Sequence, residues 1–347
     1  MFRIMVIFTG GTIGSKKRQA IDVDSAVSYE LIHRYNKDSD VHPAYFETVH
    51  PMNLLSENLI PGDWEKLYQA VKAIDVSMYD GIIITHGTDT LPYTAAAMSY
   101  TLNDCPAPIV MIASNYPLDD PRSSGYNNFV NAVNFIADTS LPGVYVSFEN
   151  RAGKALIHLG TRLQQSDPFT DEYESAYGTP FGFMERQRFL PVIHPANPAL
   201  ETIRDRSIKT FENPRYSAEI LYIRPHPGLT YDYYRFQSSK PKAVLHDLYH
   251  SGTASTRLLS DGSRHDLSAF IRFCGEQQID LYISPIKRAS DELYQSTVTL
   301  LEAGALPLAS ITVEAALVKL MLAYGSFNSK EHIRTWLTET NVFYERI

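Results

Sequence analysis

The stretch that decides the fold lies at the N-terminus: residues 1–8 read MFRIMVIF, and residues 9–14, TGGTIG, follow directly. The apolar run is typical of a β-strand, and the glycines after it predict a tight turn out of that strand. A secretory signal peptide would need a charged start, an apolar segment and a cleavage site before the fold begins. The sequence leaves no room for one, so we expect a cytoplasmic protein.

Working outward from this strand, short apolar runs alternate with longer amphipathic ones. The expected strands are 3–8, 81–85, 109–113, 144–148 and 155–159, and the expected helices are 63–74, 93–102 and 126–137. Such alternation predicts βαβ units, a parallel sheet and helices on both faces. We therefore predict an α/β fold whose N-terminal domain is flavodoxin-like or Rossmann-like.

A stretch rich in proline and polar residues, from about 181 to 214, interrupts this pattern and is typical of a linker. Beyond it we expect strands at 219–223, 243–245 and 280–284, and helices at 267–274, 292–303, 312–324 and 330–338. The predicted organisation is an N-terminal domain over 1–190, a linker over 191–214, and a smaller C-terminal α/β domain over 215–347.

Composition excludes several classes of function. Hydrophobic residues make up 44% of the 347 residues, and 31 Lys+Arg against 39 Asp+Glu give a formal charge of −8, which argues against a protein that tracks nucleic-acid phosphates. Cys105 and Cys274 are too few for a disulfide framework or a zinc site. No run of about 18 apolar residues is present, so we expect no membrane span.

The turn at 9–14 is the first candidate site. Glycines allow the backbone to approach a ligand closely, and their N–H groups can hold an anion or an oxyanion. Only Gly11 and Gly14 fit part of the dinucleotide pattern G-x-G-x-x-G, so we expect no nucleotide cofactor. Threonine hydroxyls flanking a glycine pair indicate a nucleophile or a substrate clamp, although a capped structural turn is the simpler alternative.

The second candidate site is Thr85-His86-Gly87-Thr88-Asp89-Thr90, directly after the strand 81–84. Thr90 is expected to cap the following helix, with Pro92 in its first turn. His86 is expected to be a structural hydrogen-bonding residue rather than a base. Neither interpretation explains Thr88, which is therefore the stronger functional candidate.

The third candidate site is the loop 114–125, SNYPLDDPRSSG, after the strand that ends near Ala113. Arg122 is able to anchor a substrate carboxylate. It is equally able to hold the loop together through an internal ion pair, and we favour that alternative.

Together, the blocks TGGTIG at 9–14, HGTDT at 86–90 and the pattern at 114–125 resemble the bacterial-type L-asparaginases, most closely the cytoplasmic type I branch. In the second half, residues 224–229, 249–253 and 312–315 resemble further blocks of that family. The resemblance implies a larger N-terminal and a smaller C-terminal domain, and homodimers or homotetramers with sites at subunit interfaces. It implies hydrolysis of the side-chain amide of L-asparagine, a small-molecule amino-acid amide, without cofactor or metal.

The resemblance also implies roles for single residues. Thr12 would be the nucleophile, Thr88 the second catalytic threonine, and Asp89 the carboxylate that takes part in catalysis and binds the substrate's α-amino group. Ser56 matches a substrate-contacting serine, with Glu57 beside it. The other expected substrate-binding positions are Gly11, Ser114 and Thr253, the last in place of an asparagine of the family.

This sequence departs from the family pattern at two catalytic positions. In the family's G-x-R-x-x-K block a lysine activates the second threonine, but the matching stretch 160–165 ends in Gln165. Glutamine cannot accept that proton. Neither Lys154 nor Arg162 nearby is a suitable base. The family's loop tyrosine is also absent from 15–22, and the nearest tyrosine is Tyr29.

Other charged groups have simpler interpretations. The basic run 16–18 is a solvated loop or attracts a substrate with extra negative charge. Asp291 and Glu292 are more simply explained as acidic residues that favour the start of a helix than as acids supplied to a neighbouring subunit's site. His246 and His250 lack a recognisable third ligand, so we expect no metal site.

These observations lead to one hypothesis and two alternatives. The first is an L-asparaginase-type amidohydrolase with a threonine nucleophile, acting in asparagine catabolism. The second is a related amidase with another substrate, such as glutamine, an asparaginyl peptide or a modified amino acid. The third is a catalytically weak relative that binds an amino acid.

Overall fold

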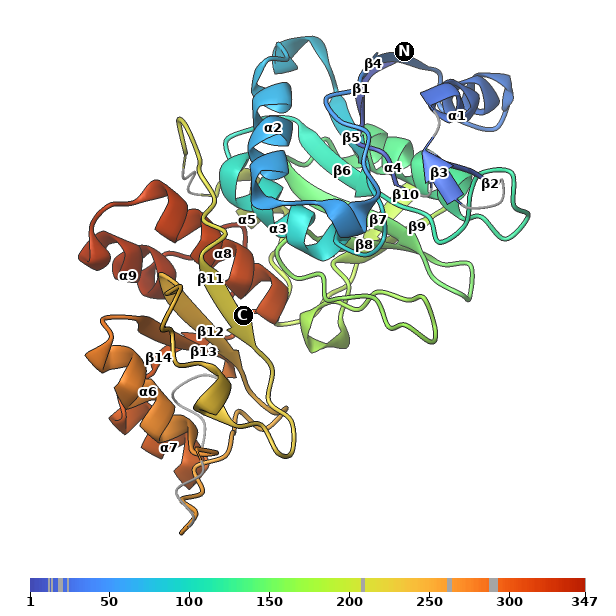
Figure 1. Ribbon diagram of the computed structural model, residues 1–347. Coiled ribbons are helices and arrows are strands. Elements are labelled where there is room, and N and C mark those ends of the chain that lie inside the picture. The colour runs from blue at the N-terminus through green and yellow to red at the C-terminus, as the bar shows by residue number, and fades with distance from the viewer. Residues whose placement is uncertain are drawn as a thin grey trace. The chain divides into compact units, whose positions relative to one another are not determined.

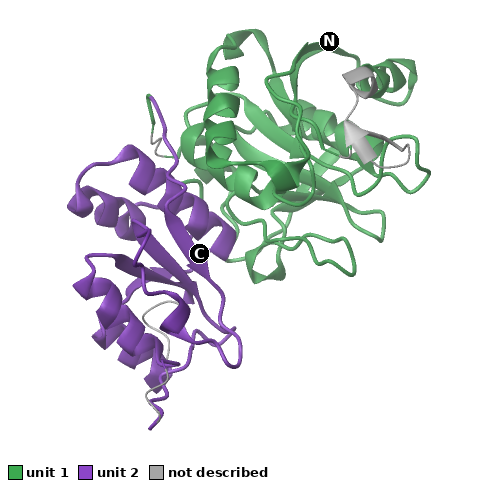
Figure 2. Ribbon diagram, in the orientation of Figure 1, with its two compact units in different colours: residues 1–212, 342–344 green, residues 213–341, 345–347 purple. Residues whose placement is uncertain are grey.

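The computed structural model describes the chain except Thr12, Gly14, 18–20, Asp24, 207–209, 261–263, 287–292 and Ile347. In the short segments 15–17, 21–23 and 25–28 only the main chain is described. The chain folds into two compact units, coloured separately in Figure 2. Unit 1 comprises Met1–Glu212 and Val342–Tyr344, and unit 2 comprises Asn213–Asn341 and Glu345–Ile347.

Among the described residues, unit 1 contains an eight-stranded sheet in the order β10-β9-β8-β7-β6-β5-β1-β4 (Figure 1). Its strands are β1 (Phe2–Phe8), β4 (Ala44–Val49), β5 (Gly81–Thr85), β6 (Pro108–Ile112), β7 (Gly143–Glu149), β8 (Ala155–Leu159), β9 (Gly182–Glu185) and β10 (Arg188–Pro191). A small antiparallel pair, β2 (Ser15–Lys17) and β3 (Ile21–Val23), follows β1. The strands from β4 to β7 are all parallel, as the alternating pattern predicted.

The sheet becomes antiparallel from β7 onward. The connection between β7 and β8 spans only residues 150–154, and a parallel crossover needs a dozen or more residues. The short connection therefore forces β8 to turn back beside β7. The sequence pattern showed the strand at 155–159 but not its direction.

Helices cover both faces of this sheet (Figure 1). They are α1 (Ser25–Lys37), α2 (Pro61–Lys72), α3 (Leu91–Thr101), α4 (Gly125–Thr139) and the short α5 (Leu200–Arg204). Helix α1 packs against α4, and α2 packs against α3. The central strands are buried on both faces, which explains why β1, β5 and β6 are continuously apolar rather than alternating.

Among its described residues, unit 2 has a parallel sheet in the order β11-β12-β13-β14. Its elements are β11 (Ile220–Ile223), β12 (Ala243–Asp247), α6 (Leu267–Glu276), β13 (Asp280–Ile286), α7 (Gln295–Glu302), β14 (Leu306–Ala309), α8 (Val313–Ser326) and α9 (Lys330–Glu339). The two-part α/β fold predicted from the sequence is confirmed. No helix in the described part of the chain is long and apolar enough to cross a membrane.

The stretch that we expected to be a linker contains regular structure. Strands β9 and β10 lie within 181–191, α5 lies within 191–214, and the two units meet in sequence between Glu212 and Asn213. The polar and proline-rich composition concealed these short elements. The division into 1–190, 191–214 and 215–347 stays a prediction about domain boundaries.

Candidate functional site

The first motif forms a tight turn at the carboxyl end of β1. Gly10 and Gly11 have φ of 107° and 79°, which favour glycine. A Cβ on Gly10 would lie 2.3 Å from the Leu54 carbonyl oxygen, and one on Gly11 would lie 2.4 Å from the Gly87 nitrogen. Both positions therefore exclude a side chain. Thr12, the expected nucleophile, lies outside the described residues.

One N–H of this turn is already used within the protein. The Gly11 N–H donates a 3.0 Å hydrogen bond to the Leu54 carbonyl. Leu54 in turn donates to the Thr9 carbonyl, and this pairing extends the β1 edge by one bridge. Gly11 also has a steric role, because its missing side chain lets the main chain of the second motif approach.

The second motif packs directly against the first at the end of β5, the strand beside β1. The Thr9 hydroxyl donates to the Thr85 carbonyl at 2.7 Å. A Cβ on Gly87 would meet the Ser56 Oγ at 2.4 Å and lies next to the Gly11 Cα at 3.4 Å. The structure therefore brings together the glycine turn, the HGTDT segment and the buried Ser56, which are far apart in the sequence.

Thr90 behaves differently from the expected helix cap. It occupies the N-cap position of α3, but its side chain caps no helix N–H. The hydroxyl donates instead to the Ser56 carbonyl at 2.9 Å. Thr90 thus ties the end of the HGTDT segment to the Ser56–Asn58 turn, while Glu57 in that turn is exposed.

Thr88 and Asp89 are held by their main chain. The Tyr173 hydroxyl donates to the Thr88 carbonyl at 2.5 Å, and the Gln165 side-chain amide donates to the Asp89 carbonyl at 2.7 Å. Thr88 is half-buried and Asp89 is exposed. In the described part of the chain, neither side chain has a hydrogen-bond or ion-pair partner, and no lysine ammonium reaches Thr88.

His86 has a structural role. It is buried, its main-chain N–H donates to Ile112 at 2.8 Å, and its ring Nδ1 lies 2.8 Å from the Gly87 carbonyl oxygen, to which it donates. Burial lowers the pKa of its imidazole to about 4, so the ring is neutral near pH 7. This geometry supports the structural interpretation of His86 over that of a base.

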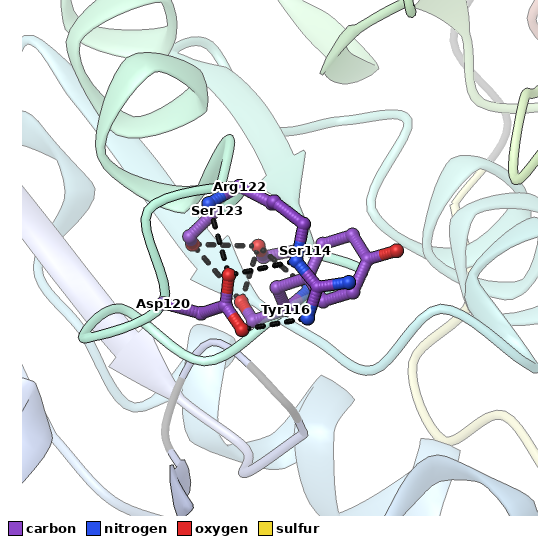
Figure 3. A network of polar contacts seen from close by, with 5 residues as sticks. All are labelled: Ser114, Tyr116, Asp120, Arg122 and Ser123. Carbon is purple, nitrogen blue, oxygen red and sulfur yellow. Dashed lines mark hydrogen bonds and ion pairs between the residues drawn. The ribbon is translucent and has the colours of Figure 1, made fainter.

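The third candidate, the loop 114–125 after β6, is closed on itself (Figure 3). The Arg122 guanidinium donates to both carboxylate oxygens of Asp120, at 2.9 and 2.8 Å, and lies 3.9 Å over the Tyr116 ring. The Ser114 hydroxyl donates to the Tyr116 carbonyl at 2.7 Å and lies 3.0 Å from the Ser123 Oγ. Arg122 therefore forms the internal ion pair that we favoured.

The remaining predicted residues lie elsewhere. Thr253 belongs to unit 2, where the Tyr249 N–H donates to its carbonyl and its hydroxyl lies 3.2 Å from that of Ser251. His246 is buried on β12 and pairs with the Tyr231 hydroxyl at 2.9 Å, and the described residues hold no group of three potential metal ligands. The side chains of 16–18, and Asp291 and Glu292, lie outside the described residues.

Sequence reasoning missed Tyr173. It contributes to the site from a loop 85 residues beyond Thr88, and no local pattern marks such a contact. Gln165 was singled out by position alone. The structure shows that this position does reach the second threonine motif, through the Asp89 carbonyl.

The glycine-lined turns and the Thr88–Asp89 segment lie at the carboxyl edge of parallel strands, where α/β folds bind small ligands. This arrangement is that of an α/β enzyme, and comparison with known proteins specifies its class. The family described as "Asparaginase, N-terminal" matches residues 3–187. The chain belongs to the asparaginase family and is an asparaginase-type amidohydrolase.

Two kinds of relatives are similar over nearly the whole chain. The L-asparaginase of Thermococcus kodakarensis is 29% identical over 348 residues, which cover 98% of each chain. A component of the glutamyl-tRNA(Gln) amidotransferase of Metallosphaera sedula is 27% identical over 344 residues, which cover 96% of this chain and 74% of that one. The sequence comparisons thus include proteins of two different names.

Solved structures agree with the fold. The thermostable L-asparaginase from Thermococcus kodakarensis matches with a TM-score of 0.78 at 26% identity, covering 99% of both chains. L-asparaginase I from Vibrio cholerae also has a TM-score of 0.78, at 22% identity, covering 100% of this chain and 99% of that one. At that lower identity the likeness concerns the fold, which is that of the type I asparaginases.

Proposed function

We propose that this protein hydrolyses the side-chain amide of L-asparagine to L-aspartate and ammonia, with Thr12 as the nucleophile. The single observation that supports this most is the meeting of Gly11, Gly87 and Ser56 at the carboxyl edge of β1 and β5. This contact supports the proposal because it brings the glycine turn that precedes Thr12 in the sequence against the segment that carries Thr88 and Asp89. In the proposal, the hydroxyls of Thr12 and Thr88 and the carboxylate of Asp89 act on one substrate.

The proposed chemistry proceeds in two balanced steps. The Thr12 oxygen attacks the amide carbon, its proton passes to the leaving nitrogen, and ammonia departs to leave an ester between Thr12 and the aspartyl group. Water then cleaves that ester, releasing L-aspartate and restoring the Thr12 hydroxyl. Thr88 is suited to relay the proton, because its hydroxyl both donates and accepts.

Two further groups would hold the substrate. The exposed Asp89 carboxylate would pair with the α-ammonium group. The main-chain N–H groups of Thr88 and Asp89 donate to no other described residue and are further candidate oxyanion donors beside the Gly10–Gly11 turn. Neither cofactor nor metal enters this scheme. We retain Ser114 and Thr253 as substrate-binding candidates. A homodimer or homotetramer and a cytoplasmic location stay predictions.

A second candidate function is supported by Gln165. A neutral amide at the position where the family resemblance implies a lysine base removes one proton acceptor from the site. The protein would then turn over asparagine slowly, act on another amide, or bind an amino acid without turnover. The chemistry of the site's carboxylate and hydroxyls still favours a small zwitterionic ligand.

One assay separates these functions. Purified protein is tested for ammonia release from L-asparagine, L-glutamine and an asparaginyl dipeptide, beside Thr12→Ala, and L-aspartate binding is measured by calorimetry. We expect ammonia from asparagine and loss of release by at least about 100-fold in Thr12→Ala. Binding without any turnover would overturn the proposed hydrolase function in favour of the binding protein.

A further inference from the structure

Residues 164–174 of unit 1 form a hairpin-like loop that is held in place by several hydrogen bonds. Its ends pair antiparallel, since Gln164 N–H donates to the Glu174 carbonyl at 2.9 Å and Asp167 N–H donates to the Glu172 carbonyl at 3.0 Å. The loop is fastened a second time by the Asn115 side chain, which donates to the Asp171 carbonyl at 3.0 Å. This loop is therefore tied to the segment that follows β6.

Two side chains near the base of this loop, Gln165 and Tyr173, donate to consecutive main-chain carbonyls of the HGTDT segment. We propose that Tyr173 and Gln165 are positioning residues that fix the Thr88 and Asp89 peptide groups, so that the side chains of these two residues are presented to the substrate. The inference rests on the proposed function, because it concerns the same site. Nothing in the sequence resemblance assigns a role to Tyr173.

The anchoring covers the whole segment. The Thr88 and Asp89 carbonyls are held by the loop, the next residue Thr90 is held by the Ser56 carbonyl, and the preceding Gly87 packs against Gly11. Successive peptide groups fixed in this way leave little rotation about φ and ψ. Ordering the backbone in advance, without involving the side chains that act, is how a site lowers the entropic barrier to reaction.

The two donors, Tyr173 and Gln165, are neutral, unlike the charged lysine that the family resemblance implies at position 165. Tyr173 is 4% exposed, and burial together with the nearby Asp89 and Asp171 carboxylates raises the pKa of its phenol far above the ordinary value. The phenol therefore keeps its proton and stays a donor over the working pH range. An amide at Gln165 donates without titrating at all.

The decisive variant is Tyr173→Phe, which removes only the donor. A matched control is Tyr68→Phe, because Tyr68 is also buried in unit 1 and also donates to a main-chain carbonyl, that of Phe211, at 2.5 Å. We expect kcat for asparagine to fall about 10-fold in Tyr173→Phe with KM changed less than about two-fold, and both constants to be unchanged in Tyr68→Phe. Equal kinetics in the two variants would overturn the proposal.

Gln165 is tested through pH. In Gln165→Glu, the carboxylate cannot donate to the Asp89 carbonyl, but the protonated acid can. We expect kcat of this variant, relative to wild type, to recover as pH falls from 7 toward 4.5, while Gln165→Met shows a constant deficit. A flat ratio for Gln165→Glu would contradict the positioning role, because lost packing alone does not titrate.

The same variants distinguish this proposal from the proposed function. If the wild-type protein releases no ammonia from any amide, the hydrolase function fails, and positioning is then judged by amide hydrogen exchange over 86–92. We expect Tyr173→Phe to speed exchange in that segment and Tyr68→Phe to leave it unchanged. Equal exchange in the two variants would overturn the positioning role independently of catalysis.

Discussion

The segments 86–90 and 114–125 follow neighbouring parallel strands, β5 and β6, and both are dense in hydroxyls and charge, yet the structure uses them in opposite ways. In 114–125 the side chains of Ser114, Asp120, Arg122 and Ser123 bind within the loop, around the Asp120–Arg122 ion pair (Figure 3). In 86–90 the main chain is held from outside. The side chains of Thr88 and Asp89 make no hydrogen bond within the described chain.

This difference gives a criterion for interpreting polar loops. A polar side chain that is satisfied within its own loop stabilises that loop. One that has no partner within the protein, while its backbone is fixed, is available to bind a ligand in place of water. By this criterion we propose that the HGTDT segment contacts the substrate and that the loop 114–125 mainly supports it.

The largest expected effect comes from deleting a side chain that has no partner in the described chain. Thr88→Val removes the hydroxyl while keeping the shape, so we expect kcat for asparagine to fall by at least about 100-fold, as for other proton-transfer groups. The control is Thr101→Val, since the Thr101 hydroxyl is buried in α3 and, among the described residues, bonds to the Ala97 carbonyl alone. Ammonia release is measured for both. Comparable losses of kcat in the two variants would show that a hydroxyl without a partner in the protein matters no more than one that is already hydrogen-bonded.

The next effect concerns the missing base. Gln165→Lys restores an amine beside the Thr88–Asp89 segment, and a lysine can still donate to the Asp89 carbonyl. We expect asparagine turnover to rise about 10-fold, with the increase greatest at high pH, where more of the amine is neutral. The measurement is a pH profile of kcat. An unchanged profile would mean that another group already serves Thr88.

The sequence predicted the parts of this site that depend on local pattern and missed those that depend on distant segments. Gly10, Gly11 and Gly87 were informative because a strand followed by glycines has few alternative uses, and the parallel sheet order brings their strand ends together. The hydrogen bond of Gly11 N–H to Leu54 and that of Tyr173 to Thr88 were not predictable. Both depend on which distant segment packs alongside, and no local periodicity encodes that.

The fold was predicted on the same basis. Strands whose apolar runs are buried on both faces were found, whereas β4 was missed because it lies at the sheet edge and carries Glu47 and Thr48. The reversal at β8 depends on the length of a connection rather than on the composition of the strand. Edge strands and changes of strand direction are thus the features that the sequence pattern predicts least well.

A third prediction uses the pH dependence of stability to test whether the buried histidines are structural rather than catalytic. Burial lowers the pKa of His86 and of His158 to about 4, against about 6.5 in an unfolded chain, so the unfolded state binds more protons between these values. The contribution of each histidine to the free energy of unfolding is therefore fully present above pH 6.5. It decreases as pH falls toward 4, by on the order of 3 kcal/mol for each histidine. Urea unfolding between pH 7.5 and 4.5 measures this decrease.

The variant that tests this assignment is His158→Gln, with the exposed His33→Gln as its control. We expect the dependence of unfolding free energy on pH to become shallower in His158→Gln and to stay as in wild type in His33→Gln. If His86 is structural, kcat shows no inflection near pH 6.5. An inflection there that disappears in His86→Gln would instead assign the imidazole to catalysis.

The smallest effect is expected where the side chains are already satisfied. Asp120→Asn removes the charge that pairs with Arg122, and since that arginine is exposed, solvent screens most of the lost attraction. We expect kcat within about two-fold of wild type and a small decrease in the urea midpoint, because the loop also keeps the Ser114–Ser123 and Tyr116 contacts. If Arg122 instead bound the substrate carboxylate, Arg122→Gln would raise KM strongly while Asp120→Asn would not. Comparing KM in these two variants therefore decides whether 114–125 supports the site or belongs to it.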